Sequence, residues 1–230
     1  SFRDRGVEIA ALETLSYVTI ENLHITKTKK SGILLRSDDY NCNHIVIDNC
    51  ETTLSYLDGI DLSGDNIHYC TVSNCYIHDN HRNGIYVGTS FNLNGTDNHY
   101  FFNNQIHNNG SIKASSEPWG RGIYLVNVTD SFFNNNDFKN NYNGCIKIME
   151  DSDRNHIYYN LFRQEISGLR AAIIYTALTG GIPSNNEVYN NVFLMEKSGF
   201  AEQANGVFFV TQSEDNIHKN NVFYSVDTCV

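Results

Sequence analysis

The chain has 230 residues, of which 40% are hydrophobic and 18% are charged, which is enough apolar material for one domain with a continuous core. No apolar run approaches the roughly 20 residues of a membrane-spanning helix, so we expect no membrane span. The net charge of −10 at pH 7 argues against nucleic acid as a partner, because phosphate binding needs a basic surface. The 32 Asn and two Pro exclude an all-helical protein and indicate one turn geometry that is used repeatedly.

A first short pattern, Asn-x-x-(Ile/Phe), recurs along the chain every 24 to 32 residues. Asn tolerates left-handed backbone and bonds locally to the main chain, so each copy predicts a turn. The copies are Asn22–Ile25, Asn74–Ile77, Asn103–Ile106, Asn135–Phe138, Asn190–Phe193 and Asn220–Phe223, with imperfect ones at Asn49–Thr52 and Tyr159–Phe162.

A second pattern, Gly-(apolar)-x-(apolar), alternates with the first and predicts a short strand in each repeat. Its apolar residues point to one side of the strand and x points to the other. The copies are Gly6–Ile9, Gly32–Leu35, Gly59–Leu62, Gly84–Val87, Gly122–Leu125 and Gly206–Phe209, with Cys145–Ile148 in the same place and a blurred copy within Ala171–Tyr175.

Strands this short bury their apolar faces only if each repeat stacks on the previous one, which makes parallel sheets. The two patterns therefore predict an all-β solenoid of about eight coils, with equivalent Asn side chains forming ladders at the turn. The whole chain resembles the pectin-lyase-like superfamily of right-handed parallel β-helices. We expect residues 1–230 to form one such domain, and its start in a strand and its end after a repeat suggest a piece of a longer protein.

Two of the places where the repeat is interrupted hold candidate sugar-binding residues. Insertions on one side of a solenoid commonly build a binding face, although tolerated drift is the alternative. The segment between Asn103 and Gly122 carries Trp119 beside Arg121, and an exposed indole face suits a sugar ring. The insertion after Tyr159 ends in Arg170.

The x positions of the second pattern are predicted to line the outer face in one row. They are Glu8, Leu34, Asp61, Tyr86, Tyr124, Lys147, Ile173 or Ile174, and Phe208. The four polar members, Asp61 to Lys147, would span about 15 Å on consecutive coils. Asp58, His81, Arg82 and Arg121 come just before the same strands. Such a strip favours a groove for an extended polar chain, and the alternative is an ordinary solvated sheet face.

The stretch from Ser55 to Ser63 and the following His78–Ile85 resemble the catalytic coils of mannuronan C5-epimerases. Asp61 matches that family's Asp, whereas Asp58, Ser63 and Asn83 stand where the family has Tyr, His and a second Asp. Asp58-Gly59-Ile60-Asp61 is also similar to part of the polygalacturonase motif. The alginate and chondroitin lyases of this fold use a Lys base and an Arg, roles that Lys147 and Arg170 would fill.

These resemblances imply a secreted or cell-surface protein that acts on a uronate-containing polysaccharide by lyase or epimerase chemistry. Both reactions remove the proton next to a carboxylate, which must be neutralised. Arg82, Arg121 or a calcium ion would neutralise it, and Tyr86, Tyr124 or Lys147 would exchange the proton, while Asp61 and His81 complete the candidate catalytic set. Acidic side chains are candidate calcium ligands, although the sequence has no recognisable calcium-binding motif. A neutral glycan is an alternative substrate.

A non-catalytic polysaccharide-binding, adhesin or phage-spike segment is the competing class, and a hydrolase of polygalacturonase type is third. The chain has no Cys-x-x-Cys motif, so we expect no zinc site. Cys50 and Cys75 follow equivalent repeat positions, so they are predicted to form either a disulfide or a stack of buried thiols.

Overall fold

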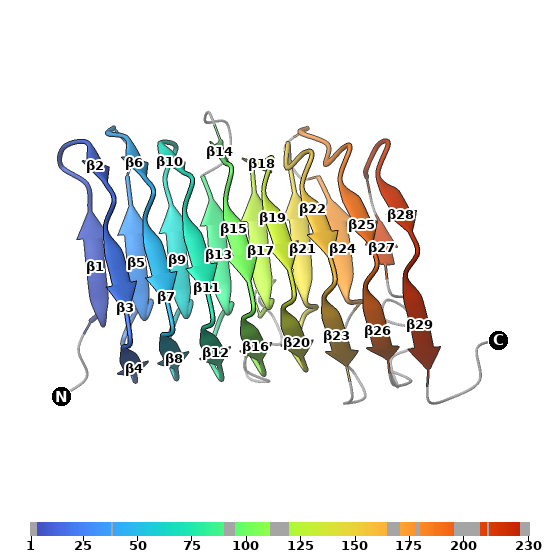
Figure 1. Ribbon diagram of the computed structural model, residues 1–230, viewed down its shortest axis with the longest axis horizontal. Coiled ribbons are helices and arrows are strands. Elements are labelled where there is room, and N and C mark those ends of the chain that lie inside the picture. The colour runs from blue at the N-terminus through green and yellow to red at the C-terminus, as the bar shows by residue number, and fades with distance from the viewer. Residues whose placement is uncertain are drawn as a thin grey trace.

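A computed structural model shows a solenoid whose coils follow one another along the long axis in chain order (Figure 1). It describes residues 4–37, 39–89, 95–110, 120–164, 171–177, 180–195, 208–210 and 212–225. Within these ranges the regular elements are all strands, and no helix is present that is long and apolar enough to cross a membrane. The prediction of a parallel β-helix of about eight coils is confirmed, since three of the four sheets have eight strands each.

The strands of the Gly-(apolar)-x-(apolar) pattern form sheet A, and short bridging strands form sheet B. Sheet A consists of β1 (Val7–Ala10), β5 (Ile33–Arg36), β9 (Ile60–Ser63), β13 (Ile85–Gly88), β17 (Ile123–Val126), β21 (Ile146–Met149), β24 (Ile173–Thr176) and β27 (Phe208–Val210). Sheet B consists of β2 (Leu15–Ser16), β6 (Cys42–Asn43), β10 (Ile67–His68), β14 (Thr96–Asp97) and β18 (Val128–Thr129).

The other two sheets flank the Asn turn, with sheet C before it and sheet D after it. Sheet C consists of β3 (Thr19–Glu21), β7 (Val46–Asp48), β11 (Thr71–Ser73), β15 (Tyr100–Phe102), β19 (Phe132–Asn134), β22 (His156–Tyr158), β25 (Glu187–Tyr189) and β28 (Ile217–Lys219). Sheet D consists of β4 (His24–Thr26), β8 (Glu51–Thr53), β12 (Tyr76–His78), β16 (Gln105–His107), β20 (Asp137–Lys139), β23 (Leu161–Gln164), β26 (Val192–Met195) and β29 (Val222–Ser225).

The core is a set of vertical stacks of like residues inside the coils. From β5 to β21, the Ile and Leu residues of sheet A that flank each x position are fully buried. On sheet D, Phe138, Phe162 and Phe193 stack with ring centroids 4.9 and 4.7 Å apart. This spacing matches the ~4.8 Å between neighbouring strands, so every coil repeats the packing of the previous one.

The turn between sheets C and D has left-handed backbone at the first residue of the Asn-x-x-(Ile/Phe) pattern. The φ angle lies between 48° and 59° at Asn22, Asn49, Asn74, Asn103, Asn135, Tyr159, Asn190 and Asn220. The turn geometry inferred from the Asn content is therefore confirmed.

The buried amide ladder lies one residue later than the sequence predicts. Asn104, Asn136, Asn160, Asn191 and Asn221 point inward, and the backbone N–H of each of the first four donates to the side chain of the next. The left-handed Asn residues instead lie outside the core, where Asn49 donates to Asn22 at 2.7 Å. The reason is that side chains alternate between the two faces of the chain, so the turn residue and its successor point opposite ways.

The left-handed position of Tyr159 gives a testable prediction. A bulky residue in this conformation is strained by about 1 kcal/mol relative to Asn, which tolerates it. We expect Tyr159→Asn to raise the free energy of unfolding by about that amount, measured by urea denaturation. A lower midpoint in the variant would contradict the account of the turn.

Of the two alternatives for Cys50 and Cys75, the disulfide does not form, and the five described cysteines are free, buried thiols. Cys50 and Cys75 occupy the inward ladder position, where side chains stack in parallel. Each thiol donates to a carbonyl of its own coil, Cys50 to Asp48 at 3.3 Å and Cys75 to Ser73 at 3.0 Å. The alternative of stacked thiols is therefore the correct one.

Candidate functional site

The outward row of sheet A is present as the strand pattern predicts. Asp61 is the register partner of Tyr86, Tyr86 of Tyr124, and Tyr124 of Lys147. Ile174, not Ile173, continues the row, and its partner is Phe209 rather than the expected Phe208, because β27 starts one residue later than the repeat implies. The four polar side chains thus come from consecutive coils and share one face.

Asp61 and Tyr86 line a pocket on this face, which we call the sheet-A pocket. Its volume is about 300 Å³, and it extends over β5, β9 and β13. The lining residues are Arg5, Lys30, Ser31, Leu34, Arg36, Leu57, Asp61, Ser63, Gly64, Asp65, Tyr86 and Gly88. Three of them are basic and two, Asp61 and Asp65, are acidic, so basic groups outnumber acidic ones here and suit an anionic group.

The sequence analysis did not single out Arg5, Lys30 or Arg36, although two of them carry a signal. Arg36 follows Leu34 by two residues, and side chains two apart on a strand share a face. Lys30 precedes Gly32 by two residues, as Arg82 precedes Gly84. Arg5 comes from the segment before β1, where it forms an ion pair with Glu8 at 2.6 Å.

The Asp61 carboxylate is held within the pocket by hydroxyl groups. Ser31 donates a hydrogen bond to Oδ2 of Asp61 at 3.1 Å. Burial raises the pKa of Asp61 above its usual value, while Ser63, Ser31 and Arg82 act in the opposite direction. A carboxylate with a raised pKa is a stronger base than an ordinary aspartate once it is ionised.

Tyr86 is a phenol that stays protonated at neutral pH. Burial is the main cause that raises its pKa, and the neighbouring Tyr124, Asp61 and Asp58 add to the effect. Its ring meets that of Tyr124 edge-on, with the centroids 5.7 Å apart. Tyr86 is therefore a candidate proton donor directly beside a candidate base.

Tyr124 and Lys147 pack against each other rather than lining the sheet-A pocket. Their exposed fractions are only 5% and 7%, and Lys147 Nζ lies 5.1 Å from the centre of the Tyr124 ring. The Tyr124 hydroxyl donates to Sδ of Met149 at 2.6 Å, and burial raises the pKa of Tyr124 to about 12.

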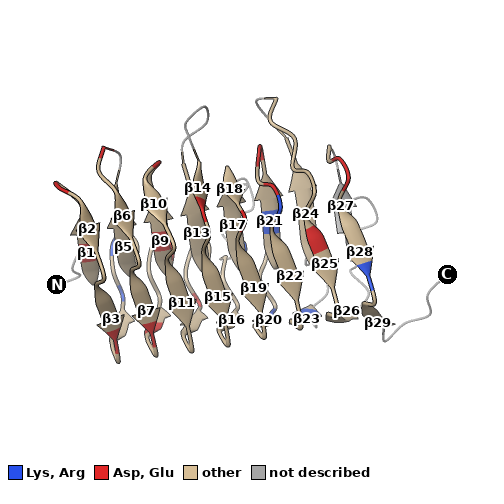
Figure 2. Ribbon diagram, turned by 45° about the horizontal axis from the view of Figure 1, so that its top comes forward, with Lys and Arg blue, Asp and Glu red and all other residues tan. Residues whose placement is uncertain are grey.

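Figure 2 shows the basic residue of β21, which is Lys147, and acidic residues at the ends of β3 and β7.

Asp58 and Arg82 do not line the pocket and instead form a structural connection between coils. Asp58 is 2% exposed, and its Oδ1 accepts from the backbone N–H and the side-chain amide of Asn83 at 3.1 and 2.8 Å. Arg82 Nη1 lies 3.7 Å from Asp58 Oδ2. Asn83 Oδ1 accepts from the N–H groups of Gly120 and Arg121, so this cluster ties three successive coils together.

The buried Asp58 predicts a pH dependence of stability. Burial raises its pKa from 3.8 to about 6, although Arg82 opposes the shift. The pKa of Asp58 is higher in the folded than in the unfolded protein, so its protonation stabilises the fold. This stabilisation is fully present below pH ~4 and is lost as pH rises through about 6. The loss amounts to about 3 kcal/mol, and Asp58→Asn should remove it.

The measurement compares the free energies of unfolding of wild type and Asp58→Asn at several pH values between 4 and 7. We expect the wild type to lose stability relative to the variant over this range. If the free energies of unfolding of wild type and variant change with pH in parallel, the raised pKa of Asp58 in the folded protein is contradicted.

The remaining candidates from the sequence lie apart from the sheet-A pocket or outside the described residues. His81 stacks on Tyr56 with ring centroids 5.0 Å apart and lines a different pocket. Arg121 is buried beside Asn83, with an exposed fraction of 2%. Trp119 and Arg170 lie outside the described residues. Within the described ranges no three His, Cys, Asp or Glu side chains are grouped as metal ligands.

Comparison with known proteins identifies the fold. A family model described as a right handed beta helix region matches residues 6–193, and a search among curated proteins finds no match. An alginate lyase from Paenibacillus is similar in structure, with a TM-score of 0.58 and 13% identity over 93% of this chain and 96% of its own.

Two further solved structures are similar at comparable levels. DFA-IIIase from Arthrobacter chlorophenolicus, in complex with DFA-III, has a TM-score of 0.65 and 15% identity, over 100% of this chain and 56% of its own. The A-module of a mannuronan C-5 epimerase from Azotobacter vinelandii has a TM-score of 0.61 and 12% identity, over 91% of this chain and 65% of its own. The chain therefore spans less than two thirds of these two proteins.

Proposed function

The chain belongs to the right-handed β-helix family, and from this premise we propose that it is a carbohydrate-active enzyme that cleaves a uronate-containing polysaccharide by β-elimination. The observation that carries the proposal is the sheet-A pocket, where Asp61 and Tyr86 are in register beside three basic side chains. We propose further that the protein acts outside the cell or on its surface, where such polysaccharides occur.

The basic side chains supply the first requirement of the reaction, which is neutralisation of the substrate carboxylate. The chain carries a net charge of −10, so a polyanion is attracted only where basic groups gather. Arg5, Lys30 and Arg36 gather in the sheet-A pocket. Pairing the uronate carboxylate with them stabilises the negative charge that develops when the neighbouring proton leaves.

Asp61 and Tyr86 supply the proton transfers. The Asp61 carboxylate takes the proton from C5, and the electron pair of the C5–H bond forms a double bond to C4 as the C4–O bond breaks. Tyr86 donates its phenolic proton to the departing oxygen, and the proton on Asp61 then returns to the Tyr86 phenolate. The raised pKa of Asp61 suits the role of base, and the raised pKa of Tyr86 keeps the phenol protonated before it donates.

The relative positions of the two groups favour elimination over epimerisation. Asp61 and Tyr86 point outward from adjacent strands, so they approach a bound sugar from the same side. Epimerisation at C5 removes a proton from one face of the ring and returns one to the other face. A syn elimination needs a base and an acid on one face only.

Two of the three similar structures have names that agree with a uronate substrate, whereas DFA-IIIase does not. Alginate lyase and mannuronan C-5 epimerase are both named for such polysaccharides. Because their identity to this chain is only 12–13%, the similarity supports the fold, and the substrate class rests on the basic pocket.

Hydrolysis of a glycosidic bond is the second candidate, because Asp65 lines the same pocket as Asp61. Two carboxyl groups that flank one sugar bond are the usual requirement of a glycoside hydrolase. A pocket that binds glycan without turnover is the non-catalytic alternative.

The test is incubation with alginate, pectate and glycosaminoglycans, with and without calcium, while the absorbance of unsaturated uronates is followed. The proposal predicts rising absorbance and products with an unsaturated end. New reducing ends without that absorbance would show hydrolysis instead. Deuterium incorporation at C5 of intact polymer would show epimerisation, and binding with no change in the polymer would show the non-catalytic function.

A further inference from the structure

A second pocket lies at the turns that lead from sheet D to sheet A, and we call it the turn pocket. Its volume is about 610 Å³, within the range of saccharide-sized and drug-sized ligand sites. The lining residues are Thr28, Lys29, Leu54, Ser55, Tyr56, Asp79 and His81. None of them lines the sheet-A pocket.

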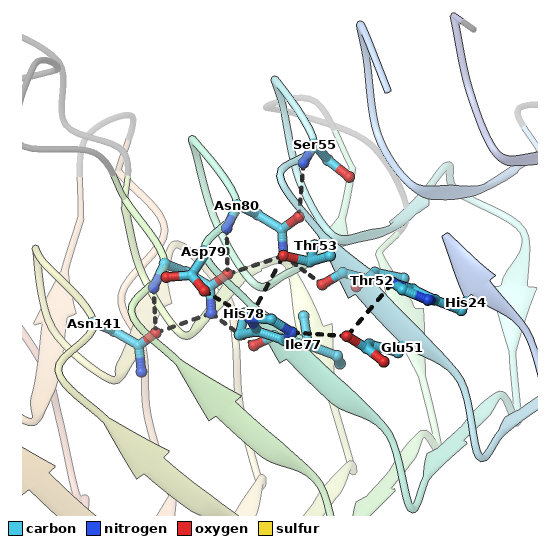
Figure 3. A network of polar contacts seen from close by, with 11 residues as sticks. His24, Glu51, Thr52, Thr53, Ser55, Ile77, His78, Asp79, Asn80 and Asn141 are labelled. Atoms are coloured by element: carbon cyan, nitrogen blue, oxygen red, sulfur yellow. Dashed lines mark hydrogen bonds and ion pairs between the residues drawn. The ribbon is translucent and has the colours of Figure 1, made fainter. Parts of the chain in front are cut away.

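The turn pocket is built from three successive turns that are held together by backbone hydrogen bonds. The N–H of Tyr56 donates to the Thr28 carbonyl at 2.9 Å, and the N–H of His81 donates to the Ser55 carbonyl at 2.9 Å. Ser55 also donates its N–H to the Asn80 side chain at 3.1 Å, within the ladder that continues to Asn141 (Figure 3). The turns therefore hold the pocket walls at fixed spacing.

The walls combine aromatic surface with polar groups at its edge. Tyr56 and His81 stack with their planes 22° apart, and 61% of the Tyr56 side chain is exposed. Asp79 lies at the edge, where His78 Nδ1 contacts its Oδ2 at 2.7 Å. The other ring nitrogen of His78 lies 3.1 Å from Glu51, so the Asp79 carboxylate is held in place by a chain of contacts across two coils (Figure 3).

The turn pocket and the sheet-A pocket are separated only by the turns themselves. Lys29 and Tyr56 line the turn pocket, while the next residues of the chain, Lys30 and Leu57, line the sheet-A pocket. Successive Cα atoms are 3.8 Å apart, so the two pockets adjoin along the same turns.

From these observations we infer that the turn pocket binds a non-reacting sugar unit of the same glycan whose uronate occupies the sheet-A pocket. A sugar ring presents C–H groups on its face, which pack on an aromatic ring, and hydroxyl groups around its edge. Tyr56 supplies the aromatic surface, and Asp79 accepts hydrogen bonds from the hydroxyls. The inference rests on the proposed function for the identity of the glycan.

The experiment measures the affinity of the full chain for oligouronates of increasing length by titration calorimetry. For the wild type we expect affinity to rise when the oligomer is long enough to reach the turn pocket. Tyr56→Ala should remove this rise and weaken binding of the longer oligomers about tenfold.

Tyr100→Ala is the matched control, because Tyr100 is also exposed (41%) and stacks on a ring of the next coil, that of Phe132, but lies on sheet C. Thermal unfolding of each variant verifies its fold. If Tyr56→Ala and Tyr100→Ala bind every oligomer alike, the inference is overturned while the proposed function stands. If binding depends on Tyr56 but no substrate is turned over, the proposed function fails and the turn pocket stands, and a wild type that binds no oligouronate overturns both.

Discussion

Asp61→Asn should lower kcat for uronate polysaccharide cleavage at least ~100-fold, because it removes the group that takes the C5 proton. The amide has nearly the same shape and still accepts the hydrogen bond that Ser31 donates at 3.1 Å. We therefore expect KM to change little and the melting temperature not to fall, because burial already disfavours the ionised Asp61 in the folded protein. The readout is the steady-state rate of unsaturated-uronate formation.

The pH profile separates a base from a residue that only shapes the pocket. Burial raises the pKa of Asp61, so activity should fall, as pH is lowered, at a higher pH than for an ordinary aspartate. The residual activity of Asp61→Asn should lack this fall. Asp130→Asn is the control, because Asp130 lies at a turn beyond sheet B and pairs with Arg154 at 2.6 Å, away from the pocket. Equal kcat in the two variants would refute the role of Asp61.

Asn160→Ala should lower the free energy of unfolding by about 4 kcal/mol, because it removes the centre of the buried amide ladder. Asn160 Oδ1 accepts from the backbone N–H and the amide of Asn136 at 2.9 and 3.0 Å. Its own amide donates to the Phe133 carbonyl at 2.9 Å and to Asn191 at 3.1 Å. The alanine removes all four of these hydrogen bonds, each worth about 1 kcal/mol, and it takes away the side-chain acceptor of the buried Asn136 N–H.

The matched control is Asn190→Ala at the left-handed turn position of the next coil. That residue points away from the ladder, so the free energy of unfolding should fall by only about 1 kcal/mol, which is the backbone strain of alanine at this position. Urea denaturation of both variants gives the comparison. Equal losses would contradict the distinction between turn Asn and ladder Asn.

The fold could be predicted from the sequence because the strand pattern is local and repeated. Gly59-Ile60-Asp61-Leu62 and Gly84-Ile85-Tyr86-Val87 fix both the strand and its inward face, and stacking of identical units then fixes the register. The sequence pattern predicts the amide ladder one residue too early. Asn occurs at both the turn position and the next position in coils such as Asn190-Asn191. Only backbone geometry separates the left-handed Asn190 from the inward Asn191.

The candidate site could be predicted only in part. The row of Asp61, Tyr86, Tyr124 and Lys147 follows from strand periodicity. Periodicity gives the direction of a side chain and not its surroundings, so the packing of Lys147 on Tyr124 and the stacking of His81 on Tyr56 could not be read from it. The basic residues of the sheet-A pocket, Arg5, Lys30 and Arg36, lie at different positions of the repeat. Only the folded coils bring them together.

A crystal structure of Asp61→Asn with a bound oligouronate tests the central claim most directly. The account predicts a uronate carboxylate within hydrogen-bond distance of Arg5, Lys30 or Arg36, with C5 of that sugar facing the side chain at position 61 and the glycosidic oxygen at C4 facing the Tyr86 hydroxyl. An oligouronate bound on another face, or one whose carboxylate points away from Arg5, Lys30 and Arg36, would contradict it.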